Sequence, residues 1–252
     1  MNYDNVFFDY ISIGSMHSAA IVAPLVLEHY SASSLVDVGC GRGAWLAEWA
    51  RAGVKDYVGV DGNYVDRDKL LFPGDRFVSR DLAKFFDLTR KFDLAVSLEV
   101  GEHIIPEASE TFVDNICRHS DAILFSAAVP GQGGTMHINE RDYDFWRTHF
   151  VARGYRLFDF VRKAVCNCRE VEPWYRYNCM FFARGSAIAK LSRAALASEI
   201  PSEEKIPIFA PISWRLRNAI IKRLPTPVVD YLIMVKRQLV LFHHRGENGT
   251  AK

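Results

Sequence analysis

The sequence has few of the features that mark secreted, disulfide-bonded or membrane-spanning proteins. Its 252 residues include five cysteines, and none of these forms a C-x-x-C pair. This scarcity argues against a disulfide framework and against a zinc site of the usual spacing. The sequence also lacks an apolar run long enough to span a bilayer, and it does not start with the basic and apolar segments of a signal peptide. We therefore expect a cytoplasmic protein.

The sequence also lacks a strong charge of either sign. The net charge is +1, with 49% hydrophobic and 24% charged residues, which is typical of a globular domain and gives no overall attraction to nucleic acid. The charges are unevenly distributed, because residues 186–252 hold eleven basic and five acidic side chains. We therefore predict a globular domain over residues 1–185 and a basic helical extension over residues 186–252.

Short apolar runs alternate with helical patterns along the first domain. Helices are predicted over residues 15–30, 44–52 and 142–153, and strands over residues 34–38, 57–60, 76–78, 92–97, 122–126, 155–161 and 177–183. Such alternation predicts an α/β fold with a doubly wound, mostly parallel sheet of seven strands.

The extension contains two further predicted helices, over residues 214–224 and 228–242. The second helix is strongly apolar with basic flanks, a composition that suits packing on its own domain, a homodimer or an anionic membrane surface. We predict that residues 212–242 make such a contact, which would place the protein peripherally at a membrane if the surface is lipid.

A glycine turn follows the first predicted strand. Gly39, Gly41 and Gly43 allow the backbone to turn sharply and to approach a ligand, and the helix that begins there offers amide donors and a positive dipole. The spacing Gly39-x-Gly41-x-x-Ala44 also fits the dinucleotide fingerprint, and Asp61 follows near the distance expected of a ribose-binding acid. Glycine spacing alone therefore allows both NAD and S-adenosylmethionine.

Acidic residues near the strand ends favour S-adenosylmethionine. Asp37 precedes the first glycine, where a carboxylate would receive an ammonium group but would repel a pyrophosphate. Asp81 and Leu82 follow the third strand and offer an acid and an apolar surface to an adenine ring, while Glu99 ends the fourth strand at the edge where such folds bind ligands. The predicted cofactor-binding residues are Asp37, Gly39, Cys40, Gly41, Gly43, Asp61, Asp81, Leu82 and Glu99.

Five segments carry a resemblance to a known family. They read LVDVGCGRGAWL (residues 35–46), GVDG (59–62), FDLAVSLEVGEH (92–103), FSAAVPGQGGT (125–135) and WYRYN (174–178). On these segments the chain resembles class I S-adenosylmethionine-dependent methyltransferases, and more narrowly bacterial ones associated with surface-polysaccharide or secondary-metabolite gene clusters. The resemblance implies a Rossmann-like fold, S-adenosylmethionine as cofactor and a sugar-like acceptor. Gly101 stands where the pattern has alanine and Tyr177 where it has glutamine.

Three residues are predicted to be catalytic. A methyl group on a sulfonium needs in-line attack, so the protein chiefly positions the reactants and excludes water. A base is needed when the acceptor holds its proton tightly, and His103, His137 and Glu140 are the candidates because they follow the fourth strand and the glycine-rich stretch 129–135. Each also has a structural interpretation, since a histidine or an acid at these positions could serve to cap a helix and have no catalytic role. Acceptor contacts are expected from Trp174, Tyr175 and Asn178.

A metal site is an alternative for part of this set. Glu99, Glu102, His103 and His137 resemble the Glu-x-x-Glu-His and distal His arrangement of small-RNA 3′-end methyltransferases, where such groups bind a divalent ion. The other RNA-binding features are absent and the first domain is slightly acidic, which suits a phosphate backbone poorly. We predict no metal and no nucleic-acid partner.

The sequence thus predicts methyl transfer from S-adenosylmethionine to a small-molecule or glycan acceptor, at a sugar hydroxyl. Two alternatives remain open at this point. One is a nicotinamide-dependent oxidoreductase, and the other is a non-catalytic scaffold subunit that keeps the fold and binds the cofactor.

Overall fold

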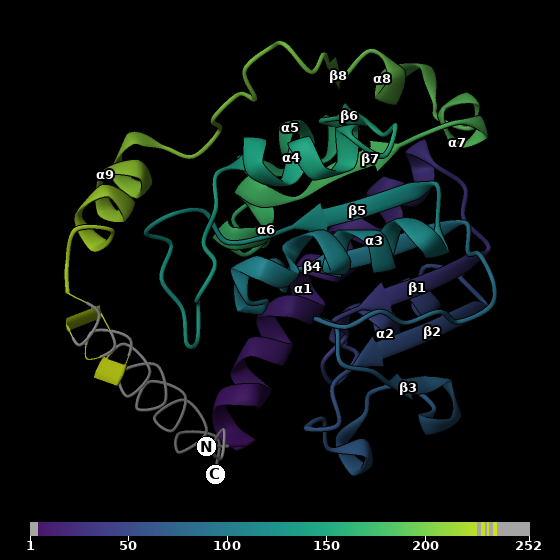
Figure 1. Cartoon of the computed structure of the whole chain (residues 1–252), viewed down its shortest axis with the longest axis horizontal. Coiled ribbons are helices and arrows are strands. Elements are labelled where there is room, and N and C mark those ends of the chain that lie inside the picture. Colours follow the sequence, from purple (N-terminus) through teal and green to yellow (C-terminus); the bar gives the residue numbers. More distant parts are fainter. Residues whose placement is uncertain (1–4, 226–227, 230, 232–233, 236–252) are drawn as a thin grey trace, which may run out of the picture.

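A computed structural model of the chain describes residues 5–225, 228–229, 231 and 234–235. Within these residues the protein forms an eight-stranded sheet in the order β3-β2-β1-β4-β5-β7-β6-β8, with helices on both faces (Figure 1). The strands are β1 (Ser34–Val38), β2 (Asp56–Asp61), β3 (Phe77–Ser79), β4 (Leu94–Leu98), β5 (Ala122–Ser126), β6 (Arg156–Phe158), β7 (Met180–Ala183) and β8 (Glu199–Ile200). The strands from β1 to β5 pair in parallel, whereas β7 and β6 run antiparallel to their neighbours. The predicted doubly wound fold is confirmed.

Helices cover the sheet in two layers. They are α1 (Asn5–His29), α2 (Ala44–Arg51), α3 (Ser109–His119), α4 (Tyr143–Val151), α5 (Phe160–Val165), α6 (Pro173–Asn178), α7 (Ser186–Ala189), α8 (Arg193–Leu196) and α9 (Ile212–Ile221). None of the described helices combines the length and the apolar character that a membrane span requires. The predicted apolar helix over residues 228–242 lies for the most part outside the described residues.

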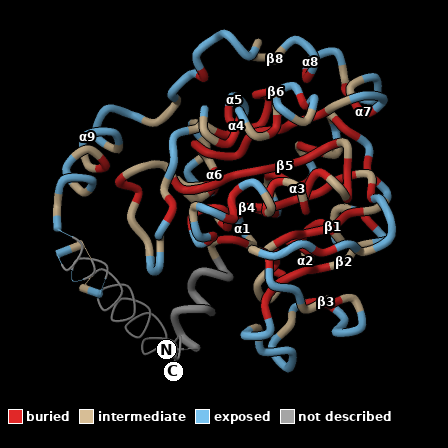
Figure 2. The backbone as a smooth tube through the Cα atoms, in the orientation of Figure 1, coloured by how far each residue is buried: buried red, intermediate tan, exposed pale blue. Residues whose placement is uncertain are grey.

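Successive residues of the central strands point to opposite faces of the sheet and so build two cores. Leu35 and Leu124 pack on the side of α1, α2 and α5. Val36 and Ile123 pack on the side of α3 and α4, with Trp146 of α4 almost fully buried there. Because both faces are covered, these strands are apolar at nearly every position. Figure 2 shows them buried along their length, whereas α9 and the segment before it are mostly exposed.

The last part of the domain differs from the sequence prediction. The predicted strand over 155–161 ends at Phe158, because a helix begins at Phe160 and brings the Arg162 guanidinium back onto the Asp159 carboxylate at 2.6 and 2.7 Å. The predicted strand over 177–183 starts only at Met180, because Pro173 begins a helix that includes Tyr177. The sheet also gains an eighth strand, β8, which pairs antiparallel with β6 and was not predicted.

The buried Arg162–Asp159 pair predicts a large stability effect. Arg162 is fully buried and also donates to the Tyr177 carbonyl, so Asp159→Ala would leave a guanidinium without its counter-charge. We expect a loss of about 3–5 kcal/mol in the free energy of unfolding, measured by urea denaturation. The matched control is Glu199→Ala, which breaks the more exposed pair with Arg156 and should cost about 1 kcal/mol or less. Equal losses in the two variants would contradict the interpretation.

Candidate active site

The glycine turn after β1 has the conformation predicted from its sequence. Gly39, Gly41 and Gly43 have φ angles of 90°, 54° and 84°. A Cβ on Gly39 would lie 2.3 Å from the Val100 side chain, and one on Gly43 would lie 2.1 Å from the Phe72 ring, so neither position has room for a side chain. At Gly41 no atom lies within 4 Å of a Cβ. The turn is therefore closed on the protein side and open at Gly41, where a ligand could approach the backbone.

Asp61 ends β2 beside this turn and holds it in place. Its carboxylate accepts hydrogen bonds from the backbone N–H groups of Gly41 (2.7 Å) and Gly62 (2.6 Å) and from the Tyr64 hydroxyl. Asp61 is only 3% exposed, because the turn folds over it. Burial raises the pKa of this carboxyl group and the three hydrogen bonds oppose that rise. A carboxylate with further lone pairs at this position suits the hydroxyls of a ribose.

Asp37 lies close to Asp61, and its carboxyl group is buried as well. The side chain is 3% exposed, and burial together with the negative charge of Asp61 raises its pKa to about 8. A cation placed beside two such acids would stabilise their charged forms. The site therefore fits the ammonium group of a methionine moiety, as the sequence predicts.

The other predicted cofactor residues of this half differ in exposure. Asp81 is exposed after β3, where it accepts a hydrogen bond from the Ala83 N–H group (3.1 Å) and pairs with Lys84 (3.2 Å). Leu82 is buried, and so is Cys40, whose thiol pKa burial raises well above its usual value. Cys40 thus packs within the turn as a neutral thiol.

Glu99 ends β4 in an unusual backbone conformation. Its φ of 56° lies in the left-handed region, which is strained for a residue with a side chain and is often found at functional sites. The Gln132 amide donates to one carboxylate oxygen at 2.6 Å, and the Asn178 amide lies 3.4 Å from the other. Asn178 also donates to the Gln132 side chain at 2.8 Å. Two amide side chains thus hold Glu99. Asn178 was predicted to lie near the acceptor, whereas Gln132 was not predicted from the sequence.

His137 and Glu140 form a hydrogen-bonded pair on the loop after β5. The distance from His137 Nδ1 to Glu140 Oε1 is 2.9 Å. Glu140 also accepts the backbone N–H groups of Gly131 (2.7 Å) and Gly133 (2.8 Å). Burial alone would raise the pKa of Glu140, but the bonds from His137 and the two glycines hold it below its usual value. An ionised Glu140 keeps the proton on His137 Nδ1 and leaves Nε2 free to accept another.

Glu102 and His103 lie against His137. Glu102 is fully buried, and neither of its carboxylate oxygens has a hydrogen-bond partner among the described residues. Its Oε1 atom is 3.9 Å from His137 Nε2, and the rings of His103 and His137 meet edge to face at 4.9 Å. The ring of His103 also approaches the Met136 carbonyl, and burial followed by the charge of His137 lowers the pKa of His103 to about 4.

These three side chains are chemically able to hold a divalent ion. One ligand atom from each of Glu102, His103 and His137 lies within 4.8 Å of the others. The structure does not bring Glu99 into this set, since Gln132 and Asn178 bind its carboxylate. Our prediction that the protein uses no metal stays a prediction, and titration of the protein with Mg²⁺ and Mn²⁺ would test it.

The residues expected to contact the acceptor lie in different environments. Tyr175 belongs to the core, where its hydroxyl meets that of Ser15 at 2.9 Å and its ring meets Trp45. Trp174 packs partly buried against the same core, whereas Asn178 faces the site through its bond to Gln132. Gly101 departs from the family pattern because a Cβ there would lie 2.7 Å from the Trp146 ring.

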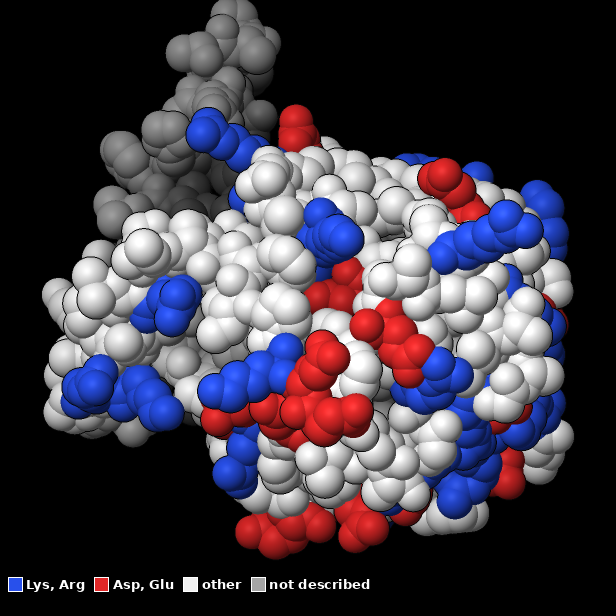
Figure 3. Space-filling view, turned by 90° about the horizontal axis from the view of Figure 1, so that it is seen from above, with Lys and Arg blue, Asp and Glu red and all other residues white. Residues whose placement is uncertain are grey.

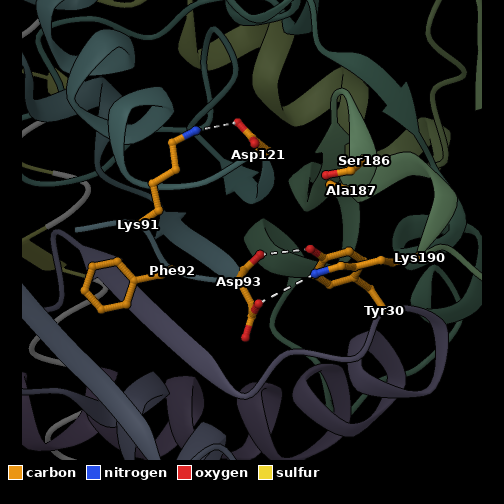
Figure 4. Close-up of a pocket in the computed structure, with 8 residues that line it drawn as sticks. All are labelled: Tyr30, Lys91, Phe92, Asp93, Asp121, Ser186, Ala187 and Lys190. Atoms are coloured by element: carbon orange, nitrogen blue, oxygen red, sulfur yellow. Dashed lines mark hydrogen bonds and ion pairs between the residues drawn. The ribbon is translucent and has the colours of Figure 1, made fainter.

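A shallow hollow of about 70 Å³ lies at the opposite edge of the sheet and is lined by Tyr30, Asp93, Asp121 and Lys190, among others (Figure 4). Its polar groups pair with one another, as in the contact of the Tyr30 hydroxyl with the Asp93 carbonyl at 3.0 Å. Seen from the side of β8, basic and acidic side chains are interspersed over the described surface (Figure 3).

Comparisons with known proteins identify the family and the fold of this chain. A family model described as a methyltransferase domain matches residues 18–146, slightly more than half of the chain. No curated protein matches the chain. Solved structures do match, among them DesVI from Streptomyces venezuelae, with 16% identity and a TM-score of 0.52 over 73% of this chain and 99% of that one.

Two further structures are similar in parts. CalS10 from Micromonospora echinaspora, solved with S-adenosylmethionine bound, has 14% identity and a TM-score of 0.54 over 73% of this chain and 98% of that one. The N-terminal domain of EvdMO1 with S-adenosylhomocysteine has 18% identity and a TM-score of 0.40 over 45% of this chain, and the match spans 50% of that domain. At these identities the likeness shows the fold.

The position of Asp61 predicts a loss of cofactor affinity on substitution. Asp61→Asn keeps the size of the side chain but removes the charge that would bind two ribose hydroxyls. We expect the affinity for S-adenosylhomocysteine to fall about 100-fold in titration calorimetry, the result of losing charge-assisted hydrogen bonds. Asp75→Asn, at an exposed acid between β2 and β3, is the control and should leave the affinity unchanged. Wild-type affinity in Asp61→Asn would refute the assignment.

The raised pKa of Asp37 predicts a pH-dependent stability. The folded protein holds the Asp37 proton up to a pH of about 8, well above the range of an unfolded chain. This contribution is full below the unfolded pKa and is lost as the pH rises through about 8. We therefore expect Asp37→Asn to flatten the fall in melting temperature as the pH rises from about 4 to about 8, by about 2–4 °C for each kcal/mol of stability that Asp37 loses over that range. Identical pH profiles of the two ligand-free proteins in calorimetry would contradict this.

Proposed function

This chain belongs to the methyltransferase domain family, and from that premise we propose that it methylates a hydroxyl group of a sugar-like small molecule or glycan. The enzyme is an S-adenosylmethionine-dependent methyltransferase, so the oxidoreductase and scaffold alternatives are set aside. The identity of the acceptor is the part that we propose.

The cofactor residues occupy one edge of the sheet. Gly41 offers an open backbone, Asp61 suits the ribose and Asp37 suits the ammonium group. When bound there, S-adenosylmethionine supplies a methyl group on a sulfonium, which is an excellent leaving group. The acids and the turn of this chain hold it in one orientation, which lowers the entropic part of the barrier.

The pairing of His137 with Glu140 is the observation that carries the proposal. A sugar hydroxyl keeps its proton at neutral pH, so its methylation needs a base within hydrogen-bond reach. In our proposal His137 is this base. Its Nδ1 proton is directed at Glu140 by the 2.9 Å bond, so the Nε2 lone pair is the one that would accept the hydroxyl proton. The hydroxyl proton would pass to His137 Nε2 as the oxygen is methylated, and S-adenosylmethionine, when bound, would supply the methyl group.

The neighbours of His137 support this role. The pKa of His103 is lowered to about 4, so this ring is neutral at physiological pH and can accept or donate without adding a positive charge. Burial raises the pKa of Glu102, and the nearby acids Glu99 and Glu140 raise it further. A protonated Glu102 would place a neutral carboxyl group beside the base.

One structural neighbour supports the acceptor class. CalS10 is an amino pentose methyltransferase involved in calicheamicin biosynthesis, and its fold is similar to that of this chain. Incubation of the protein with labelled S-adenosylmethionine and a panel of nucleotide sugars and glycans, followed by mass spectrometry, tests the proposal directly. A methyl group on a hydroxyl supports it, whereas methylation of nitrogen alone or of a non-sugar acceptor alone would overturn it.

Replacement of the proposed base gives a quantitative prediction. His137→Ala should lower kcat by about 10²- to 10⁴-fold, the usual contribution of a positioned base. The dissociation constant of S-adenosylhomocysteine should stay the same, because His137 does not touch the glycine turn or Asp61. His29→Ala is the control, since His29 pairs with Ser192 at the opposite edge of the sheet. An unchanged turnover rate in His137→Ala would exclude this histidine as the base.

A further inference from the structure

The helix α9, in the C-terminal extension, has one face directed toward the active site. Trp214, Arg217, Asn218 and Ile221 follow the i, i+3, i+4, i+7 spacing of a single helix face. Asn218 on this face is 7% exposed. The opposite side of the helix is open, because Leu216 is 61% exposed.

The inner face of α9 contacts the glycine-rich loop, residues 129–135. Arg217 Nη1 donates to the Gln132 carbonyl at 3.0 Å. A Cβ on Gly131 would lie 2.1 Å from the backbone carbonyl oxygen of Asn218, and one on Gly133 would lie 3.8 Å from Ile221. The glycine at 131 is therefore required by the close approach of the helix backbone as well as by its φ of 82°.

A second contact joins α9 to α6. The rings of Trp214 and Tyr177 lie 5.9 Å apart. Both residues lie outside the range 18–146 that the family model matches. The two contacts place α9 against both segments that hold Glu99, the loop through Gln132 and α6 through Asn178.

The backbone of the loop also holds the proposed base. Gly131 and Gly133 donate their N–H groups to Glu140 at 2.7 and 2.8 Å, and Glu140 orients His137 at 2.9 Å. Between these two glycines, the Gln132 side chain donates to Glu99 at 2.6 Å. A small shift of the loop would therefore move the base and Glu99 together.

We infer that α9 is a latch that holds the glycine-rich loop in its active position, and that Arg217 is a positioning residue for methyl transfer. The catalytic part of this inference rests on the proposed function. Arg217 does not touch the base or the cofactor residues in the described contacts, so it acts through the backbone of Gln132.

The chemistry of Arg217 supports a role beyond packing. The side chain is half-buried, and its described hydrogen bonds go to the Gln132 carbonyl and the Asn218 side chain, which are neutral acceptors. Burial lowers the pKa of this guanidinium, and the charge of Glu140 offsets the effect only in part. Partial burial of this cation, whose other described contact is the Trp214 ring at 5.1 Å, costs stability that an uncharged residue would not lose.

The first test compares Arg217→Ala with Arg215→Ala, an exposed arginine of the same helix. Arg217→Ala should lower kcat by about 10- to 100-fold, the effect expected of a small misplacement of catalytic groups, and should leave the KM for S-adenosylmethionine within about threefold. Arg217→Lys, which keeps one donor, should restore part of the rate. Equal rates in Arg217→Ala and Arg215→Ala, or a fall that comes only from lost folded protein, would overturn the inference.

The second test does not depend on the acceptor. Amide hydrogen exchange measured by mass spectrometry should be about tenfold faster over the peptide that contains residues 129–140 in Arg217→Ala than in Arg215→Ala. Unchanged exchange in that peptide would overturn the latch even if the enzyme methylates a sugar. If wild-type protein methylates no hydroxyl, the proposed function fails, while faster exchange in Arg217→Ala would still support the latch.

Discussion

The hydrogen bond from the Gly41 N–H group to the Asp61 carboxylate is the contact on which the cofactor half of the site depends. It joins the turn after β1 to the end of β2. It thereby fixes Gly41, the glycine of this turn that has open space where a Cβ would lie. It also brings a second acid, Asp37, close to the first in a buried place. Two buried acids side by side lower the free energy of unfolding of the free protein. A ligand that carries a positive charge would remove this cost when it binds.

The acceptor half of the site also depends on hydrogen bonds to buried carboxylates, but these bonds come from other donors. Glu99, Glu102 and Glu140 are gathered behind the carboxyl edge of the sheet, and each has a different set of partners. Amide side chains hold Glu99, backbone N–H groups of the glycine-rich loop hold Glu140, and Glu102 has no hydrogen-bond partner among the described residues. Equivalent side chains thus acquire different protonation states from their surroundings. His137 lies between two of these acids and takes its orientation from one of them.

Local patterns were sufficient to predict the first half of the fold. The strand, glycine turn and helix over residues 34–51 depend on neighbouring residues, and the alternation of apolar runs then implies the parallel sheet. Prediction failed where distant contacts decide the structure. The buried pair of Asp159 and Arg162 ends β6, and the strand β8 exists only because β6 offers it an edge.

The site shows the same division between local and distant effects. Residues beside the turn could be located from spacing, whereas Gln132, Arg217 and the unpartnered carboxylate of Glu102 could not. Their roles depend on contacts between segments more than thirty residues apart, such as that of Arg217 with Gln132. Tyr175, which we expected to contact the acceptor, instead lies in the core. The residues that surround a pocket are fixed by tertiary packing, which a single sequence records only indirectly.

The short strand β8 has a consequence for how the protein can be divided. Its two residues, Glu199 and Ile200, cover the outer edge of β6, where unpaired backbone groups would otherwise face solvent. Open sheet edges of this kind recruit strands from other molecules and promote aggregation. A fragment that stops at residue 185 would expose that edge, so shortened versions of the protein should retain at least this strand.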